Sequence, residues 1–307
     1  MMNKHALFSN DVETHSIWHN TLRDQTGETV LKEGLPLLLE IYAKHNIRST
    51  FFFVADYARK YPDVVKLVLP YGHEVASHGY THEAEQAFDV LSLPEQREHL
   101  RKSKEILEDI SGQEVVSFRA PALRVNGHTA EALAEAGYKI DSSVPSQRFD
   151  MFLSFGSRNK LKWLAAPRLP YRTKERDLTR KGAGPIVEVP LSAMLFPYVG
   201  TTMRVFPGLT RIQRSLIHWE SRWNKKPVVF DIHPNEFIDE SGGPREIARR
   251  SRNFITYLLA DLVRSKLKVK NLGPQAVPLY EEEVRFYLKR NYVFTTIRDY
   301  CELRGFI

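Results

Sequence analysis

Three histidines and two acidic residues stand out because of their types and their spacing. The stretch "HEVASHGYTH" contains His73, His78 and His82, and the last two are four positions apart. Near the amino terminus, "FSNDVE" carries Asp11 and Glu13, whose carboxylates would project to the same side of an extended chain. Two imidazoles and one carboxylate, with positions left open for water and substrate, are the ligands of a hydrolytic zinc site. Taken alone, the H-x-x-x-H spacing is weak evidence, and a helix N-cap would also explain the acidic pair.

The elements that would position these residues alternate between strand and helix. Apolar, β-branched or aromatic runs predict strands at 5–9, 49–55, 73–77, 114–118, 138–142, 185–192 and 227–232. Apolar residues at helical spacing predict helices at 30–46, 62–72, 92–111, 126–138, 209–223 and 280–289, with a last one after Thr295 or Thr296. This alternation is typical of parallel βα units. We therefore expect one domain over residues 1–307, with an irregular, substrate-facing excursion at about 146–185.

Charged and imidazole residues stand where the predicted strands end. They are Asp11, Glu13, His78, His82, Arg119, Asp141 and His233. The carboxyl ends of parallel strands share one face of an α/β sheet, and sites are built on that face. We therefore expect these side chains, although far apart in the sequence, to converge on one cleft.

Several short motifs resemble those of the polysaccharide deacetylase (NodB-homology) family of metal-dependent carbohydrate esterases. "FSNDVE" is similar to the first motif in the D-x-D/E form of a cytoplasmic branch, "SHGYTH" to the second, "FRAP" to the third, "DSS" to part of the fourth and "DIHP" to the fifth. "FTTIRDY" is similar to the family's closing segment. The resemblance implies a distorted (β/α) barrel with fewer than eight strands, in which residues 146–185 form a long inserted loop region.

The resemblance also implies roles for individual residues. The metal ligands would be Glu13, His78 and His82, holding a divalent ion for which Zn²⁺ is the expected choice. Asp11 would act as general base and Arg119 would hold it ionised, while His233 would act as general acid toward the departing amine.

The fourth and fifth motifs depart from the family pattern. Val144 and Pro145 stand where an acid and a tryptophan are common, so Asp141 and Asp231 are both candidates for the group that tunes His233. Asp231 also stands where the family commonly has a leucine lining the acetyl pocket, so a changed acyl pocket is expected. The tryptophans Trp163, Trp219 and Trp223 are expected to pack rather than to form sugar platforms.

The net charge of +7 suggests an anionic partner. Much of the positive excess lies at 244–254 and 264–271, where a solvated helix face is the expected role. A phosphorylated substrate or peripheral contact with an anionic membrane would also fit, whereas no nucleic-acid-binding signature accompanies the charge. The single cysteine, Cys301, excludes an internal disulfide. Without a signal-peptide pattern or an apolar run of membrane-spanning length, the expected location is the cytoplasm.

These observations predict a metal-dependent deacetylase acting on the N-acetyl group of a sugar. Surface-polysaccharide precursors of O-antigen type, which are nucleotide- or lipid-linked, would carry phosphates suited to the basic surface. Two alternatives remain: a hydrolase of a small linear or cyclic amide, allantoinase-like, and a non-catalytic carbohydrate-binding protein. The retention of Asp11, Arg119 and His233 argues against the second alternative, because binding alone does not need them.

Overall fold

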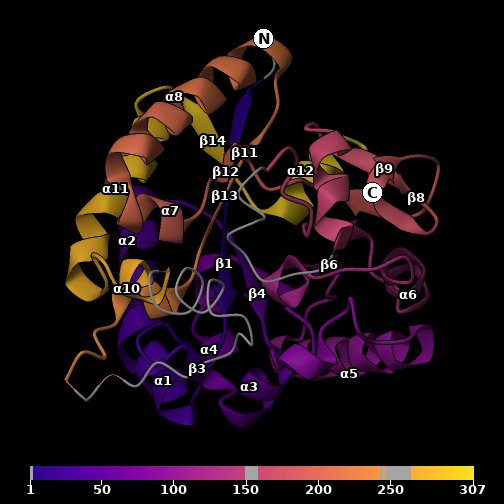
Figure 1. The fold of residues 1–307 in the computed structure, drawn as a ribbon, viewed down its shortest axis with the longest axis horizontal. Helices are drawn as coiled ribbons and strands as arrows, with labels where there is room; N and C mark the ends of the chain where they lie inside the picture. Colours follow the sequence, from indigo (N-terminus) through magenta and orange to yellow (C-terminus); the bar gives the residue numbers. More distant parts are fainter. Residues whose placement is uncertain (1–2, 149–157, 243–244, 246–263) are drawn as a thin grey trace.

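The computed structural model describes residues 3–148, 158–242, 245 and 264–307 (Figure 1). Its centre is a ten-stranded sheet in the order β13-β1-β4-β5-β6-β7-β10-β8-β9, with β14 paired to β1. Seven neighbouring strands run parallel: β13 (Val228–Ile232), β1 (Lys4–Val12), β4 (Thr50–Phe53), β5 (Glu74–Ser77), β6 (Ser117–Phe118), β7 (Ile140–Asp141) and β10 (Val187–Glu188). This run confirms the predicted α/β architecture with fewer than eight barrel strands. The other three strands bring the whole sheet to ten.

Helices cover the outside of the sheet. Figure 1 shows α2 (Leu35–His45), α8 (Pro207–Asn224) and α11 (Ala276–Leu288) on one side, and α3 (Ala55–Lys60), α5 (Leu93–Ser111) and α6 (Thr129–Glu135) on the other. The shorter helices are α1 (Asp24–Thr29), α4 (Asp63–Lys66), α7 (Gly200–Val205), α10 (Arg264–Lys268) and α12 (Ile297–Leu303). A capping box begins α5, in which the Ser92 amide donates to Glu95 Oε2 at 2.7 Å. In the described part of the chain, no helix is both long enough and apolar enough to cross a membrane.

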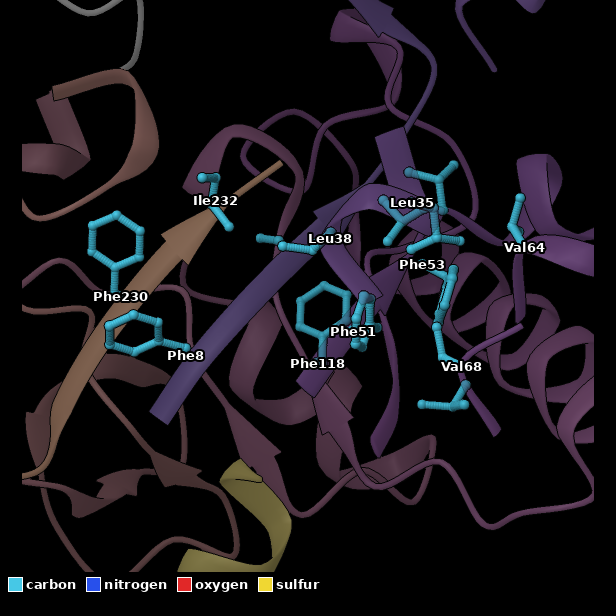
Figure 2. Packing of buried hydrophobic residues seen from close by; sticks show 14 of the residues in the cluster. Phe8, Leu35, Leu38, Phe51, Phe53, Val64, Val68, Phe118, Phe230 and Ile232 are labelled. Carbon is cyan, nitrogen blue, oxygen red and sulfur yellow. The ribbon is translucent and has the colours of Figure 1, made fainter. Parts of the chain in front are cut away.

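The two faces of the sheet bury different clusters. Phe8, Phe51 and Phe53 face the surrounding helices and belong to one buried cluster with Leu38 and Ile232 (Figure 2). Residues that alternate with these, such as Leu7 and Phe52, belong to a second cluster, which α12 completes with Ile297, Tyr300 and Cys301. Because side chains alternate along a strand, Ser9 and Asp11 lie on the same side of β1 as Leu7. The second cluster therefore lies on the same face of the sheet as the polar residues at the end of β1.

Some predicted elements differ from the structure in extent. β1 continues to Val12, so Asp11 lies inside the strand rather than after it. A π-helix at Val30–Gly34 precedes α2, and the predicted helix at 62–72 divides into α4 and a 3₁₀ turn at Leu69–Tyr71. The two-stranded pairs β2 (His15–Ser16) with β3 (Thr21–Leu22), and β11 (Ala193–Met194) with β12 (Phe196–Pro197), were not predicted.

The region at 146–185 is more regular than the sequence suggests. β8 (Tyr171–Lys174) and β9 (Asp177–Lys181) form an antiparallel hairpin, and β8 pairs with β10, so this hairpin extends the central sheet. Residues 149–157 of the excursion lie outside the described residues. The prediction for the tryptophans is right for Trp163, which is 1% exposed, and wrong for Trp219 and Trp223, which are 68% and 81% exposed.

Candidate metal centre and active site

The end of β1 delivers two carboxylates to one side of the sheet. Asp11 is held in the ladder opposite Phe52 of β4, and the Val12 side chain between the two acids is buried on the opposite face. Asp11 and Glu13 are 4% and 5% exposed, so both carboxylates are largely withdrawn from solvent. An acidic pair buried to this extent requires cationic or hydrogen-bonding partners. The helix N-cap alternative is thereby excluded for Asp11, which lies within a strand.

His78 and His82 follow β5 in a turn that faces these carboxylates. The His78 amide donates to the Phe53 carbonyl at 2.7 Å, which extends the β4–β5 pairing by one residue. Gly79 has a φ of +77°, a left-handed conformation that turns the chain back so that His82 also points inward. The two imidazole centroids are 5.5 Å apart. This turn, rather than a helix, brings the two rings together.

The His78 ring is oriented as a metal ligand would be. Its Nδ1 lies 2.9 Å from the backbone carbonyl of Arg119, and because a carbonyl only accepts, Nδ1 must carry the hydrogen. The lone pair of Nε2 therefore points toward the carboxylates. Burial lowers the pKa of His78 to about 4, so the ring is neutral at physiological pH. A neutral imidazole whose second nitrogen donates to a carbonyl is the usual arrangement of metal-binding histidines.

Ligand atoms of Glu13, His78 and His82 all lie within 4.8 Å of one another. His82 Nε2 is 2.7 Å from Glu13 Oε2, yet this buried oxygen has no hydrogen bond of good geometry. Burial raises the pKa of Glu13, but His82 and His233 outweigh burial and hold it well below the usual value. An ionised, incompletely bonded carboxylate between two imidazoles fits a divalent cation. The predicted ligand set is thus brought together.

Arg119 links Asp11 to a second acid. It follows β6, is fully buried, and lies 4.2 Å above the Phe52 ring. Its Nη1 donates to Asp11 Oδ1 at 2.8 Å and to Asp231 Oδ1 at 2.6 Å, while its Nε donates to the Ser142 carbonyl at 3.0 Å. The expected Arg119–Asp11 pairing is therefore present. The sequence did not suggest that Asp231 would share the same guanidinium.

The two carboxylates that share Arg119 have different affinities for protons. Burial would raise the pKa of Asp11, but Arg119, His78 and His233 lower it below its ordinary value. Burial and the negative charge of Asp11 raise the pKa of Asp231 to about 8. Of the two acids that share this guanidinium, Asp231 therefore holds a proton more readily than Asp11 does.

His233 lies directly after β13 and faces both carboxylates of the D-x-E pair. Its Nε2 is 3.9 Å from Asp11 Oδ2 and 3.9 Å from Glu13 Oε1. Its side chain is 26% exposed, more than the 19% of His82 and the 2% of His78. His233 is therefore the most solvent-accessible imidazole of the three and the one best placed to meet a substrate.

The Nδ1 of His233 contacts Glu236, a residue that the sequence analysis did not single out. Glu236 Oε1 lies 3.3 Å from His233 Nδ1, and its other oxygen accepts from the buried Arg204 of α7. Burial would lower the pKa of His233, but Glu236 and Asp231 outweigh it and raise this pKa to about 10. A Cβ on Gly200 would lie 2.3 Å from Glu236 Oε1, so the absence of a side chain there leaves room for the carboxylate.

Asp141 occupies a neighbouring position with other partners. Its Oδ1 accepts from the Ser143 hydroxyl at 2.6 Å, and it is paired in register with Glu188 of β10. Burial raises the pKa of both Asp141 and Glu188. Within the described residues, the carboxylate in contact with His233 Nδ1 is Glu236, and Asp231 is a further charge that acts on this ring. A signal for Glu236 was present in the sequence, because H-P-N-E has the three-residue spacing of a capping box.

Comparison with known proteins agrees with this geometry. Residues 32–140 match the polysaccharide deacetylase family. Over this region the chain is similar to polysaccharide deacetylases. It is 29% identical to a peptidoglycan deacetylase of Helicobacter pylori over 116 residues, and 30% identical to a peptidoglycan-N-acetylglucosamine deacetylase of Bacillus cereus over 89 residues. These matches cover 38% and 29% of this chain and 39% and 31% of the two relatives, well under half of each.

The whole fold is also similar to a solved structure. A crystal structure from Mycobacterium smegmatis, assigned to the polysaccharide deacetylases, superposes with a TM-score of 0.62 over 98% of this chain and 90% of that one, at 18% sequence identity. At this identity the likeness shows the fold alone. The similarity of fold covers nearly the whole chain, whereas the match to the family is limited to residues 32–140.

Proposed function

We propose that this protein is a metal-dependent deacetylase that hydrolyses the N-acetyl amide of a sugar. The observation that carries the proposal is the clustering of Glu13, His78 and His82 beside the Asp11–Arg119 pair and His233. The relation to polysaccharide deacetylases supports it independently, because it rests on sequence similarity over residues 32–140 and not on side-chain positions.

The ligands in this proposal are Glu13, His78 and His82. Two imidazoles and a carboxylate suit Zn²⁺, and we propose that ion. A divalent cation bound there would polarise the acetyl carbonyl and acidify the attacking water. The Nδ1 bond of His78 to the Arg119 carbonyl supports this assignment, because it fixes the ring with Nε2 toward the other two ligands.

The protein's own residues would perform the proton transfers. Asp11 Oδ1 is held by Arg119, which leaves Oδ2 to take a proton from the attacking water as the new C–O bond forms. His233, oriented by Glu236, would deliver a proton to the amine nitrogen as the C–N bond breaks. The products are acetate and a free amino sugar. Protonation of the nitrogen is needed because an amine anion is a poor leaving group.

We propose a phosphate-bearing sugar, nucleotide- or lipid-linked, as the substrate, in surface-polysaccharide synthesis of O-antigen type in the cytoplasm. The net charge of +7 supports an anionic substrate. The single cysteine, buried and free, supports a reducing compartment. This part of the proposal is contradicted if removal of the pyrophosphate from the sugar leaves kcat/KM unchanged, or if cell fractionation places the protein outside the cytoplasm.

The activity is tested by measuring bound metal and acetate release from a panel of N-acetylated sugars. The informative variant is His82→Ala, and the matched control is His128→Ala, because His128 lies exposed at the start of α6. We expect His82→Ala to lose both metal and turnover, and His128→Ala to retain both. Circular dichroism of both variants shows whether the fold survives.

Other results would favour the alternatives. Metal binding with sugar affinity but without acetate release from any sugar would indicate a carbohydrate-binding protein. Release of ammonia or ring opening from small linear or cyclic amides, with acetylated sugars left intact, would indicate an amide hydrolase of the allantoinase-like kind. Metal content in His82→Ala equal to that of the wild type would contradict the ligand assignment itself.

A further inference from the structure

Helix α8 has its polar and apolar faces reversed relative to an ordinary surface helix. Its buried residues are mostly polar: Thr210, Gln213, Arg214, Ile217 and Ser221. Its exposed face carries large apolar residues at positions four, three and four apart: Ile212, Leu216, Trp219 and Trp223. At 100° per residue these four side chains form one stripe, about 16 Å long from the first to the last. A surface helix of a globular protein normally shows the opposite pattern.

The stripe is most exposed at its carboxyl-terminal end. Trp219 and Trp223 are stacked with centroids 6.4 Å apart, and both are more than two-thirds exposed. Together with Arg222 they line a hollow on the surface. Ile212 and Leu216, 62% and 46% exposed, continue the apolar line toward the start of the helix. Contiguous exposed apolar side chains of this size mark an interaction site.

Cations lie near the carboxyl-terminal end of α8. Arg222 on α8 and Lys225 directly after it are exposed, and both act with Arg290, which follows α11, on Lys4 at the start of β1. Burial lowers the pKa of Lys4, and the positive charges of Arg222, Lys225 and Arg290 lower it further. In the described part of the chain, three of them donate to backbone carbonyls and none forms an ion pair with a carboxylate.

From this arrangement we infer that α8 docks the protein onto an anionic phospholipid surface. Tryptophans with a rim of arginine and lysine are the composition of helices that lie in the membrane interface, where the rings enter the headgroup region and the cations meet lipid phosphates. A second copy of this chain fits less well, because pairing two such stripes would bring two sets of unneutralised cations together. This inference does not depend on the proposed deacetylation.

Vesicle co-sedimentation tests the inference with the full chain. We expect binding to phosphatidylcholine vesicles that contain phosphatidylglycerol, and little binding to pure phosphatidylcholine. The double variant Trp219→Ser/Trp223→Ser should weaken binding about tenfold or more, because it removes the apolar anchor. The variant Arg222→Gln/Lys225→Asn should weaken binding roughly 10- to 30-fold at low salt, since each cation near an anionic surface contributes a factor of about five.

Matched controls separate docking from general effects of charge and hydrophobicity. Lys174→Gln/Lys181→Gln also removes two positive charges, but from the β8–β9 hairpin, which lies away from α8 in Figure 1. Leu303→Ser removes an apolar side chain that is 68% exposed on α12. Both controls should bind vesicles as the wild type does.

Three results would overturn the inference. The first is an absence of binding to phosphatidylglycerol vesicles at low salt. The second is equal loss of binding in Arg222→Gln/Lys225→Asn and Lys174→Gln/Lys181→Gln, which would reduce the effect to net charge. The third is a wild-type dimer in light scattering that becomes a monomer in Trp219→Ser/Trp223→Ser, which would assign the stripe to a second copy. Acetate release from a soluble substrate should be the same in both α8 variants as in the wild type, so failure here leaves the deacetylase proposal untouched.

Discussion

Replacing Gly34 by alanine tests whether the turn that carries His233 is fixed by close packing. Gly34 ends the π-helix, and a Cβ at this position would lie 2.4 Å from the Pro234 carbonyl oxygen and 3.0 Å from Ile238 Cγ2. Ordinary contacts of a Cβ begin at 3.4 Å, so the methyl group would be about 1 Å too close to the carbonyl. A backbone oxygen cannot rotate away, so either the π-helix or the turn must move.

The expected cost follows from this overlap. Overpacking a buried contact destabilises a protein by about 1–3 kcal/mol, and the better helix propensity of alanine returns less than about 1 kcal/mol of that. Because Pro234 directly follows His233, a shift of about 1 Å in the turn would displace the imidazole by a similar amount. Misplacement of a catalytic group by about 1 Å lowers turnover by about 100-fold.

Urea unfolding and acetate release measure the two effects separately. Gly208→Ala is the matched control, because Gly208 lies in α8 with no atom within 4 Å of the added Cβ. The control should gain about 0.5–1 kcal/mol from helix propensity and keep full turnover. If Gly34→Ala were as stable and as active as Gly208→Ala, close packing against Gly34 would not be what positions the His233 turn.

Three further predictions concern two kinds of buried polar group and one helix cap. Glu236→Gln should lower the free energy of unfolding by about 3 kcal/mol, because it leaves the Arg204 guanidinium buried without its anion. A loss below about 1 kcal/mol in urea unfolding would contradict this expectation. Burial lowers the pKa of His73 and of His99 to about 4, so the unfolded chain binds more protons than the folded one below pH 6.5. The free energy of unfolding should therefore fall by about 3 kcal/mol per histidine as the pH drops from 6.5 to 4. The variant His99→Gln should show a shallower decline. Ser92→Ala should cost about 1 kcal/mol in thermal unfolding through loss of the α5 capping box, and an unchanged Tm would show that the cap is dispensable.

The sequence was most informative where a local pattern determines the result. The helix predicted at 92–111 matches α5, and the cap of α12 is Thr296, one of the two residues expected. Strand ends were informative for the site, because parallel strands present their carboxyl ends on one face whatever their exact length. The convergence of Asp11, Glu13, His78, His82, Arg119 and His233 therefore followed from the order of strands and helices.

The hydrogen-bond partners of the individual site residues could not be predicted, because they depend on contacts between segments that are distant in the sequence. Asp231 was expected to change an acyl pocket, but its carboxylate bonds to Arg119, 112 positions away. The partner of His233 was sought in Asp141 or Asp231, and the contact on Nδ1 comes from Glu236, held by Arg204 of a helix that was not predicted. The tryptophans on α8 were expected to pack, because an apolar stripe at helical spacing usually marks the buried face, but α8 buries mostly polar residues instead.

The division of roles that we propose for the two acids of "DVE" is supported by what each oxygen contacts. One oxygen of Asp11 is fixed by Arg119, so only Oδ2 faces His78 and His233, at 3.7 and 3.9 Å. Both oxygens of Glu13 face imidazoles, Oε2 toward His82 and Oε1 toward His233, and among the described residues no guanidinium forms an ion pair with this carboxylate. Asp11, with one oxygen held by Arg119 and the other free, suits proton transfer. Glu13, which is buried among imidazoles without a permanently charged partner, suits binding of a metal ion. The single residue between them, Val12, serves this division by placing its side chain in the core on the other face of β1.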